Sequence, residues 1–466
     1  MRIDSGYELG CQELAEKYIE LGHSVLVATS ENTPKLANYP EPKHIDVRRI
    51  FSPIKYYDEG FNQHFQTNTI YFYEKVMAFG GYVESNCIAL KRLIENENPD
   101  LIWIFNPLGL GPVGILDTAI SCQTKVIIHL MEHIDRAILD HNQLFDLKPK
   151  WRYLKSQTIA VSCSKKMIIA NSLLGEYKHN KLVYNSLKLQ GNQVYTPPSE
   201  QAFNKHKSDI FRLVYFGQIA EKKGVLLLLN LAKKIVKSHY KSRMIIDIYG
   251  RGEKNILDYL QKQLDLDPEL SSVFAIKGFL SKNNLMQRLS EYDLAIFLLS
   301  NDEPFAYAPI DAMLAGLPVI LTSGTGVSEV LTNNYDVIFV EDRNNISDVY
   351  SKVILSLEDR NKLRAISENA IKTIERYFDL DSVAIPQLNN IIEGISPSKG
   401  YSFEYVLAIC ETIKYPYFEL AVTNHLSGAR YKFIDKLVNY FYKIPFFGKK
   451  GKTLIKFCIE IYKKYR

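Results

Sequence analysis

The chain has 466 residues, of which 46% are apolar and 23% are charged, and its formal net charge is +5. A chain of this length exceeds one ordinary hydrophobic core, and the composition is that of a globular protein with two or more domains. The longest uncharged stretch near the middle, residues 101–116, contains Asn106, prolines and glycines, which excludes a membrane-spanning helix there. The first 30 residues lack the apolar core of a secretory signal, so we expect a cytoplasmic protein.

The cysteines give no sign of a metal site or of a disulfide framework. They are widely scattered, and none forms a CxxC pair or lies near a histidine at metal-ligand spacing. We therefore expect reduced, mostly buried thiols. The six residues are Cys11, Cys87, Cys122, Cys163, Cys410 and Cys458.

Short apolar runs alternate with amphipathic segments along most of the chain. This alternation is typical of parallel sheets that are covered on both faces, so we predict two doubly wound α/β domains. The polar, proline-containing stretch at residues 189–209 is the expected linker between a first domain, residues 1–188, and a second domain, residues 210–395. Strands are predicted at residues 24–29, 45–50, 101–105, 125–130, 158–163, 211–217, 244–250, 273–278, 294–299, 317–322 and 337–341.

The beginning of the chain lacks an element that this fold class requires. A turn with Gly6 and Gly10 leads into an amphipathic helix and then into the strand at residues 24–29. A doubly wound domain normally has a central strand before such a turn, whereas only residues 1–3 precede it here. We expect that the true start lies upstream of Met1. The alternative is a first sheet without its middle strand.

Several loops of the second domain follow a predicted strand directly. Ligands of open parallel sheets bind outside the carboxyl ends of the strands, so these loops can line one rim. Glycines let main-chain amides approach a phosphate, the helix N-termini that follow favour an anion, and Lys223 adds a positive charge. A glycine after one strand is more often only a turn, but the four loops together predict a site for a phosphorylated, nucleotide-linked ligand. They are residues 217–224, 250–254, 300–308 and 323–326, with Gly217, Gly224 and Gly250 among their glycines.

Two acids follow the apolar run at residues 294–299. Glu303 comes just past the end of this predicted buried strand, where a side chain faces a crevice, and Asp311 follows eight residues later. Pro309 marks the start of a helix, so Asp311 can be explained as a first-turn acid that complements the helix dipole. Glu303 has no such structural explanation, which favours a functional role for it.

These motifs carry a resemblance to a known family. The segments "FRLVYFGQIAEKKG", "IDIYGRGE" and "SNDEPFAYAPIDAMLAG" resemble the nucleotide-sugar domain of retaining GT-B glycosyltransferases, the glycosyl transferases group 1 family. The opening "SGYELGCQELAEKYIELGHSVLVATS" is similar to the start of the acceptor domain in that family. The resemblance covers roughly residues 5–395. It implies two Rossmann-like domains that face each other across a cleft, with a nucleotide sugar as substrate and neither a cofactor nor a metal.

The resemblance also implies roles for individual residues. Lys223 would hold the donor diphosphate, Glu303 would hydrogen-bond hydroxyls of the transferred sugar, and Asp311 would bind the ribose hydroxyls. A carboxylate suits the last two roles because it accepts two hydroxyls at once. The phosphates would lie against main-chain amides at the start of the helix that follows Glu303, and the glycine loops named above would also contribute to the site. These further binding positions are Gly217, Gln218, Gly224, Gly250, Phe305, Ala306 and Tyr307.

In the first domain, the resemblance places a histidine that meets the donor sugar near "HLMEH", residues 129–133. His133 is our candidate for this catalytic role. His129 competes with it, and Met131 occupies the position that a simple alignment selects. A lone histidine at such a position is more often structural than functional.

Three residues depart from the family pattern. Gln218 stands where the family often has an arginine, which removes one cationic contact to the leaving diphosphate. Ala306 replaces the usual glycine and adds a methyl group near the phosphates, and Asp311 is one methylene shorter than the usual glutamate.

Residues 396–466 lie beyond the resemblance and end in a basic segment. Residues 430–466 contain eleven Lys or Arg and only two acids, and apolar residues at helical spacing predict basic amphipathic helices there. Such helices could lie on an anionic membrane surface, or they could pack against the body with solvated lysines. No base-reading motif accompanies the charge, so we expect no nucleic-acid partner.

Two functional hypotheses follow. The first is a retaining, nucleotide-sugar-dependent hexosyltransferase that acts on a glycan or lipid-linked acceptor in cell-surface polysaccharide synthesis, in the cytoplasm or peripherally at the inner face of the membrane. The second is a non-catalytic GT-B-like protein that binds a glycan or a partner, which the three departures and the missing strand favour. An oxidoreductase is disfavoured because no GxGxxG follows a predicted strand.

Overall fold

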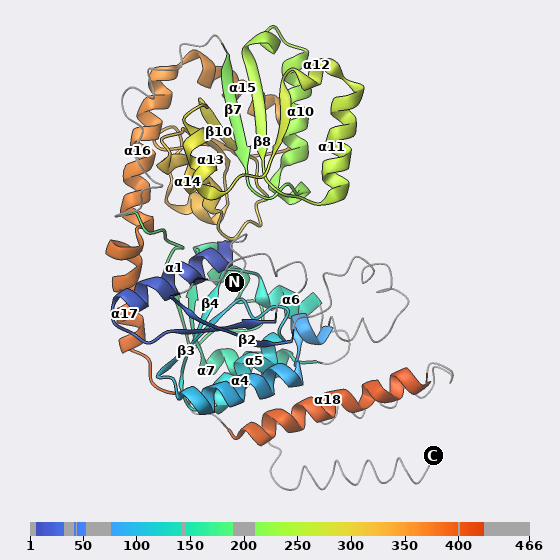
Figure 1. Ribbon diagram of the computed structural model, residues 1–466, viewed down its shortest axis with the longest axis vertical. Coiled ribbons are helices and arrows are strands. Elements are labelled where there is room, and N and C mark those ends of the chain that lie inside the picture. Colours follow the sequence, from blue (N-terminus) through green and yellow to red (C-terminus); the bar gives the residue numbers. More distant parts are fainter. Residues whose placement is uncertain are drawn as a thin grey trace.

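The computed structural model describes residues 6–31, 42, 44–52, 76–140, 146–189, 210–398 and 401–423. Within these residues the chain forms two α/β units stacked end to end, the first below the second in Figure 1. All but the first residue of the expected linker at 189–209 lies outside the described residues, and so does the whole basic segment at 430–466.

The first unit contains two parallel sheets. Its elements are α1 (Gly6–Glu20), β1 (Leu26–Ser30), β2 (Asp46–Phe51), α4 (Glu84–Glu97), β3 (Leu101–Phe105), α5 (Pro112–Ser121), β4 (Lys125–Leu130), α6 (Ile134–Asp140), α7 (Lys148–Gln157), β5 (Ile159–Ser162), α8 (Lys165–Ala170) and β6 (His179–Leu182). The main sheet has the order β3-β4-β5-β6, and β4 is buried at five of its six positions. β1 and β2 pair only with each other, so no strand among the described residues joins them to the main sheet.

A buried ion pair lies inside the first unit. Lys155 Nζ donates to Asp135 Oδ2 at 2.7 Å and to Asn171 O at 2.6 Å, and neither charged side chain has exposed surface. Trp151 Nε1 and the Leu174 main-chain N–H also donate to the Asp135 carboxylate, at 2.7 and 2.8 Å. The network therefore ties α6 and α7 to the turn that follows α8.

The second unit is a single six-stranded parallel sheet with helices on both faces. Its elements are β7 (Phe211–Phe216), η2 (Glu221–Lys223), α10 (Val225–Val236), η3 (Lys241–Arg243), β8 (Met244–Tyr249), α11 (Lys254–Leu266), α12 (Pro268–Ser271), β9 (Phe274–Gly278), α13 (Lys282–Leu289), β10 (Leu294–Phe297), α14 (Tyr307–Leu314), β11 (Val319–Thr322), η4 (Gly326–Val330), β12 (Ile338–Val340), α15 (Ile346–Glu358) and α16 (Arg360–Phe378). The strand order is β12-β11-β10-β7-β8-β9.

The strand order reverses between β7 and β10, which sets the place of a ligand site. Leu213 and Val214 of β7 pair in parallel with Leu294 and Ala295 of β10, although the two strands are far apart in sequence. The chain leaves β7 toward β8 on one side and leaves β10 toward β11 on the other. The loops after β7 and β10 therefore diverge and leave a crevice at the carboxyl ends of the strands, where open α/β sheets bind ligands.

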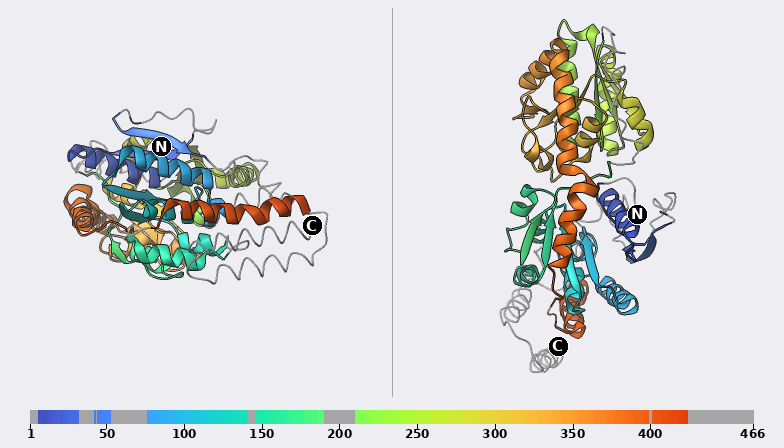
Figure 2. Two further views of the ribbon diagram at one scale, coloured as in Figure 1. Left: turned by 90° about the horizontal axis from the view of Figure 1, so that it is seen from below. Right: turned by 90° about the vertical axis from the view of Figure 1, so that its left-hand side faces the viewer.

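The chain returns to the first unit after α16. Leu187 bonds to the main chain at this crossing: its N–H donates to Phe378 O, and its carbonyl oxygen accepts from Leu380 N, both at 2.9 Å. The π-helical turn η5 (Leu380–Ala384) and α17 (Ile385–Glu393) then pack against Ile127 and Val161 of the main sheet. Figure 2 shows α16 running along the second unit and α17 continuing from it along the first. Residues 380–395, which sequence analysis assigned to the second domain, thus belong to the core of the first.

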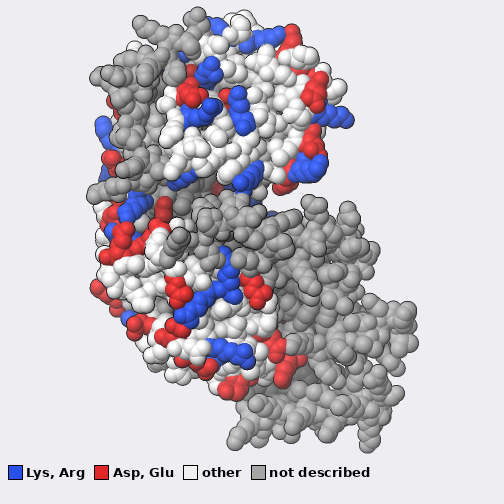
Figure 3. All heavy atoms as spheres, in the orientation of Figure 1, with Lys and Arg blue, Asp and Glu red and all other residues white. Residues whose placement is uncertain are grey.

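A last helix, α18 (Phe403–Thr423), lies on α4 and α5 of the first unit. Asp117 of α5 is fully buried, accepts hydrogen bonds from Tyr82 and Tyr401, and lies 2.9 Å from Lys150 Nζ. This network anchors the segment that leads into α18. On the face shown in Figure 3, basic and acidic side chains are interspersed over both units. The count of charged residues, eleven Lys or Arg against two acids, places the positive excess of the chain in residues 430–466, and the helices predicted there stay a prediction.

Candidate functional site in the crevice of the second unit

Lys223 and Glu303 meet at the crevice between β7 and β10. Lys223 Nζ donates to Glu303 Oε2 at 2.6 Å, and their side chains are only 20% and 11% exposed. Gly224, which follows Lys223, has a φ of +83°, and a Cβ there would lie 2.1 Å from Leu298 O. Only glycine therefore lets the η2 turn pack against the end of β10 and bring the lysine to the glutamate.

The glycine loops after β7 and β8 pack against each other. Gly217 N donates to Tyr249 O at 3.0 Å, and a Cβ at Gly250 would lie 1.8 Å from Gly217 O. Gln218 is exposed beside them, and its main-chain oxygen accepts the hydrogen bond of Tyr215 at 2.7 Å. Gly250 is thus needed for the contact between the loops, whatever ligand the rim binds.

The N-terminus of α14 borders the same crevice. Ala306 precedes the helix in an extended conformation, and no side chain caps this end among the described residues. The amides of Phe305, Ala306 and Tyr307 are thus grouped at the positive end of a helix dipole, an arrangement that suits phosphate. The Tyr307 side chain reaches the first unit, because a Cβ at Gly10 of α1 would lie 3.0 Å from Tyr307 Oη.

Asp311 lies one turn further along α14 and is paired across the rim. Lys282 Nζ, from the first turn of α13, is 3.3 Å from Asp311 Oδ1, and the Asp311 side chain is 14% exposed. A ligand hydroxyl that binds this carboxylate would therefore share it with a lysine.

The histidine candidates of the first unit take different positions. His133 Nε2 lies 3.1 Å from Asp302 O, in the loop that carries Glu303, so His133 contacts main chain next to the crevice. His129 is buried and stacks on Phe105 with ring centroids 4.8 Å apart, and burial lowers its pKa to about 4. Met131 is also buried and lines a pocket between the units. The role of His133 toward a donor sugar stays a prediction.

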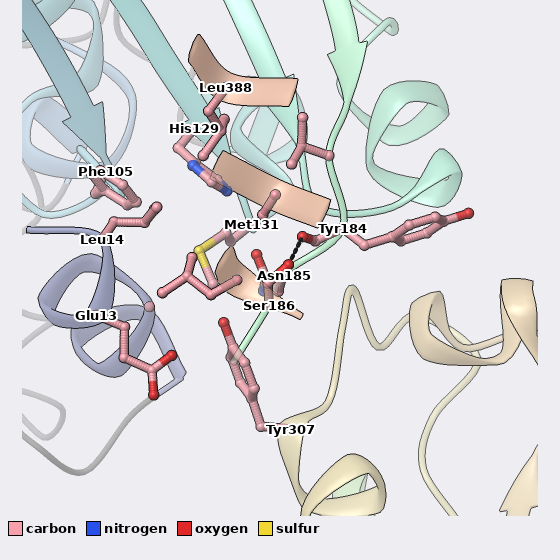
Figure 4. Close-up of a pocket in the computed structure, with 14 residues that line it drawn as sticks. Glu13, Leu14, Phe105, His129, Met131, Tyr184, Asn185, Ser186, Tyr307 and Leu388 are labelled. Carbon is pink, nitrogen blue, oxygen red and sulfur yellow. Dashed lines mark hydrogen bonds between the residues drawn. The ribbon is translucent and has the colours of Figure 1, made fainter. Parts of the chain in front are cut away.

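This pocket is lined by residues of both units. Figure 4 shows α1 on one side, the loop after β6 on another, and Tyr307 entering from the second unit with its hydroxyl toward Asn185 and Ser186. Glu13 of α1 lines it as well, and its Oε2 atom is buried without a hydrogen-bond partner among the described residues.

Two acids of the first unit that sequence analysis did not single out face the second unit. Burial raises the pKa of Glu13 to about 7, and the charges of Lys282 and Asp311 act on it in opposite directions. Burial also raises the pKa of Glu132, which lies close enough to Lys222 and Glu303 for their charges to affect it. Glu13 lies with Gly10 and Leu14 on one face of α1, but this helical spacing does not reveal that the face meets the second unit.

The raised pKa of Glu13 predicts that the free energy of unfolding depends on pH. Its folded-state pKa of about 7 exceeds the ordinary value of 4.5, so its stabilising contribution is complete below pH 4.5 and is lost as the pH rises through 7. Glu13→Gln cannot ionise and is expected to be more stable than the wild type at pH 8, by on the order of 1 kcal/mol. Thermal unfolding of both proteins between pH 5 and 8 measures this difference. A difference that does not shrink toward pH 5 would contradict a buried, protonated Glu13.

Two Rossmann-like units with a ligand crevice at the switch point of the second define the GT-B class of fold. Residues 198–373 match the family Glycosyl transferases group 1. The chain is 23% identical over 405 residues to an uncharacterized glycosyltransferase of Methanocaldococcus jannaschii, covering 83% of this chain and 94% of that protein. It is 24% identical over 233 residues to the capsular polysaccharide biosynthesis glycosyltransferase CapM of Staphylococcus aureus, covering 48% of this chain and 58% of that protein.

Solved structures show the same fold. HepE of Anabaena in complex with UDP-glucose has a TM-score of 0.62 at 17% identity, covering 84% of this chain and 96% of that one. Sucrose-phosphate synthase of Thermosynechococcus elongatus also has a TM-score of 0.62, at 13% identity, covering 84% of this chain and 93% of that one. These similarities confirm the predicted α/β fold with GT-B architecture.

Proposed function

We propose that the chain is a hexosyltransferase that moves a sugar from a nucleotide-sugar donor to a glycan or lipid-linked acceptor with retention of configuration. The observation that carries the proposal is the Lys223–Glu303 pair at the switch point of the second unit, with the uncapped N-terminus of α14 beside it. A cation and grouped amides suit a diphosphate, and a carboxylate suits sugar hydroxyls. HepE was solved with UDP-glucose, which favours UDP as the nucleotide.

The proposed chemistry depends on where charge develops. Breaking the bond between the sugar and the diphosphate leaves negative charge on the phosphates, and Lys223 with the α14 amides is already oriented to stabilise it. The acceptor hydroxyl would attack from the same face and pass its proton to the leaving phosphate, which gives retention. This scheme uses no metal and no cofactor. Closure of the two units would exclude water and limit hydrolysis of the donor.

The proposal extends to the acceptor and to the location of the enzyme. CapM is named for capsular polysaccharide biosynthesis, which favours a cell-surface glycan or its lipid-linked precursor as acceptor. In the part of the chain that is described, no helix combines the length and hydrophobicity needed to cross a bilayer. We propose that the segment at residues 430–466 holds the enzyme on the anionic inner face of the membrane.

A non-catalytic GT-B-like binding protein is the second candidate. It is favoured by the Lys282–Asp311 ion pair, which occupies the carboxylate proposed for the ribose. Gln218 and Ala306 also favour it, since the resemblance implies that arginine is frequent at the first position and glycine is usual at the second.

The first test is calorimetric binding of a panel of UDP- and GDP-sugars to the full chain. We expect one donor to bind, Glu303→Ala to weaken that binding strongly, and Glu291→Ala, which removes an exposed acid elsewhere in the unit, to leave it unchanged. Binding of a donor without transfer to any acceptor would favour the second candidate. Failure of a folded chain to bind any donor would exclude the proposed reaction.

A further inference from the structure

Two side chains of the first unit hold the loop that carries Glu303. Lys166 Nζ, at the start of α8, donates to Asn301 O, and His133 Nε2 lies 3.1 Å from Asp302 O. Both oxygens belong to the main chain of the two residues that precede Glu303. These two side chains of the first unit therefore hold the loop through its main chain.

The same end of α8 also binds an acid of the second unit. The main-chain N–H groups of Lys165 and Lys166 donate to Glu329 Oε2 and Oε1, each at 2.8 Å. Burial and the nearby Glu329 charge raise the pKa of Tyr184, another residue of the first unit. The Glu329 carboxylate is thus held by first-unit groups, although η4 belongs to the second unit.

The turn that carries Glu329 is itself packed against the Glu303 loop. Gly326 N donates to Glu303 O at 3.1 Å. A Cβ at Gly326 would lie 1.7 Å from Pro304 O and 3.0 Å from Ser164 Cβ of the first unit. The loop, the turn and the start of α8 are therefore in mutual contact, so a movement of α8 away from the second unit removes part of the support of the loop.

We propose that Lys166 and Glu329 form a latch between the units that couples their closure to the position of Glu303. Both are positioning residues, since they contact main chain and not the reacting groups. The contacts are partly exposed, so water can replace them when the units separate, and their modest net free energy suits a contact that opens and closes. The role of the latch in transfer rests on the proposed function, whereas the latch itself does not.

Solution scattering of the full chain without ligand tests the latch directly. Lys166→Met and Glu329→Gln are expected to give a larger radius of gyration than the wild type, with unchanged circular dichroism. Lys165→Met is the matched control, because its side chain is exposed and the substitution keeps the main-chain N–H that Glu329 accepts. Identical scattering from the wild type and from both latch variants would overturn the proposal, whatever the chain catalyses.

The coupling to Glu303 is tested with the donor identified by the binding panel. Lys166→Met is expected to lower kcat about 10-fold, because a displaced Glu303 would hold the donor sugar in a poorer geometry for the chemical step. Its affinity for UDP, which lacks the sugar that Glu303 is proposed to contact, is expected to stay unchanged, and Lys166→Arg is expected to restore part of the rate. An unchanged kcat would overturn the coupling. If the wild type binds no nucleotide sugar, the proposed function fails while the scattering result still decides the latch.

Discussion

Replacing Lys223 with alanine is expected to lower the rate of sugar transfer by about 100-fold to 1,000-fold, the cost of removing one group that stabilises charge in a transition state. The lysine lies 2.6 Å from Glu303 at the crevice, where the leaving diphosphate is proposed to lie. Its removal would also leave the Glu303 carboxylate, which is only 11% exposed, without the cation that it pairs with. Initial rates at saturating donor measure the effect on kcat.

Lys222→Ala is the matched control for this prediction. Lys222 is the preceding residue and is exposed, and its main-chain oxygen, which accepts a hydrogen bond from Ser300 N at 2.9 Å, survives the substitution. A far smaller loss is expected from it. Equal losses in the two variants would indicate a general electrostatic effect, and a wild-type rate in Lys223→Ala would exclude this lysine from the reaction.

Lys155→Met is expected to destabilise the first unit by about 3–5 kcal/mol, because it leaves a buried carboxylate without its cation. Asp135 would keep the hydrogen bonds from Trp151 and Leu174 but would lose the only positive charge within 4 Å among the described residues. The free energy of unfolding in urea measures the loss, followed by tryptophan fluorescence because Trp103 and Trp151, the two tryptophans of the chain, both lie in the first unit.

The double variant Asp135→Asn with Lys155→Met separates charge from packing. It removes both members of the ion pair and is expected to be more stable than Lys155→Met alone, since no unpaired charge remains. A loss of less than about 1 kcal/mol in the free energy of unfolding of Lys155→Met would contradict a buried ion pair, because exposed ion pairs contribute no more than that.

The strands were predictable where they are buried and apolar. The predicted ranges 101–105 and 125–130 coincide with β3 and β4, and the predicted ranges 211–217 and 244–250 each exceed β7 and β8 by one residue. β6, with the sequence HNKL, was missed because it is a polar edge strand whose side chains are exposed or half-buried. The return of residues 380–395 to the first unit was missed because an amphipathic helix does not reveal which sheet it packs against.

The residues of the candidate site were also predictable only in part. Lys223 and Glu303 could be placed together because each follows a strand at the switch point of one sheet, and the family resemblance pointed to the same pair. Glu13, Glu132 and Lys166 could not be found this way, since their importance depends on how two separate units face each other. No local pattern in the sequence contains that relation.

The return of the chain after α16 limits how this protein can be dissected. The second unit is one continuous segment, residues 210–378, but the first is discontinuous, because α17 fills part of its core from a point some 200 residues downstream of β6. A fragment that stops at residue 189 would leave Ile127 and Val161 uncovered and prone to aggregate. Separate expression therefore favours the second unit, whereas the first requires a circular permutation or a short artificial bridge from residue 189 to residue 379.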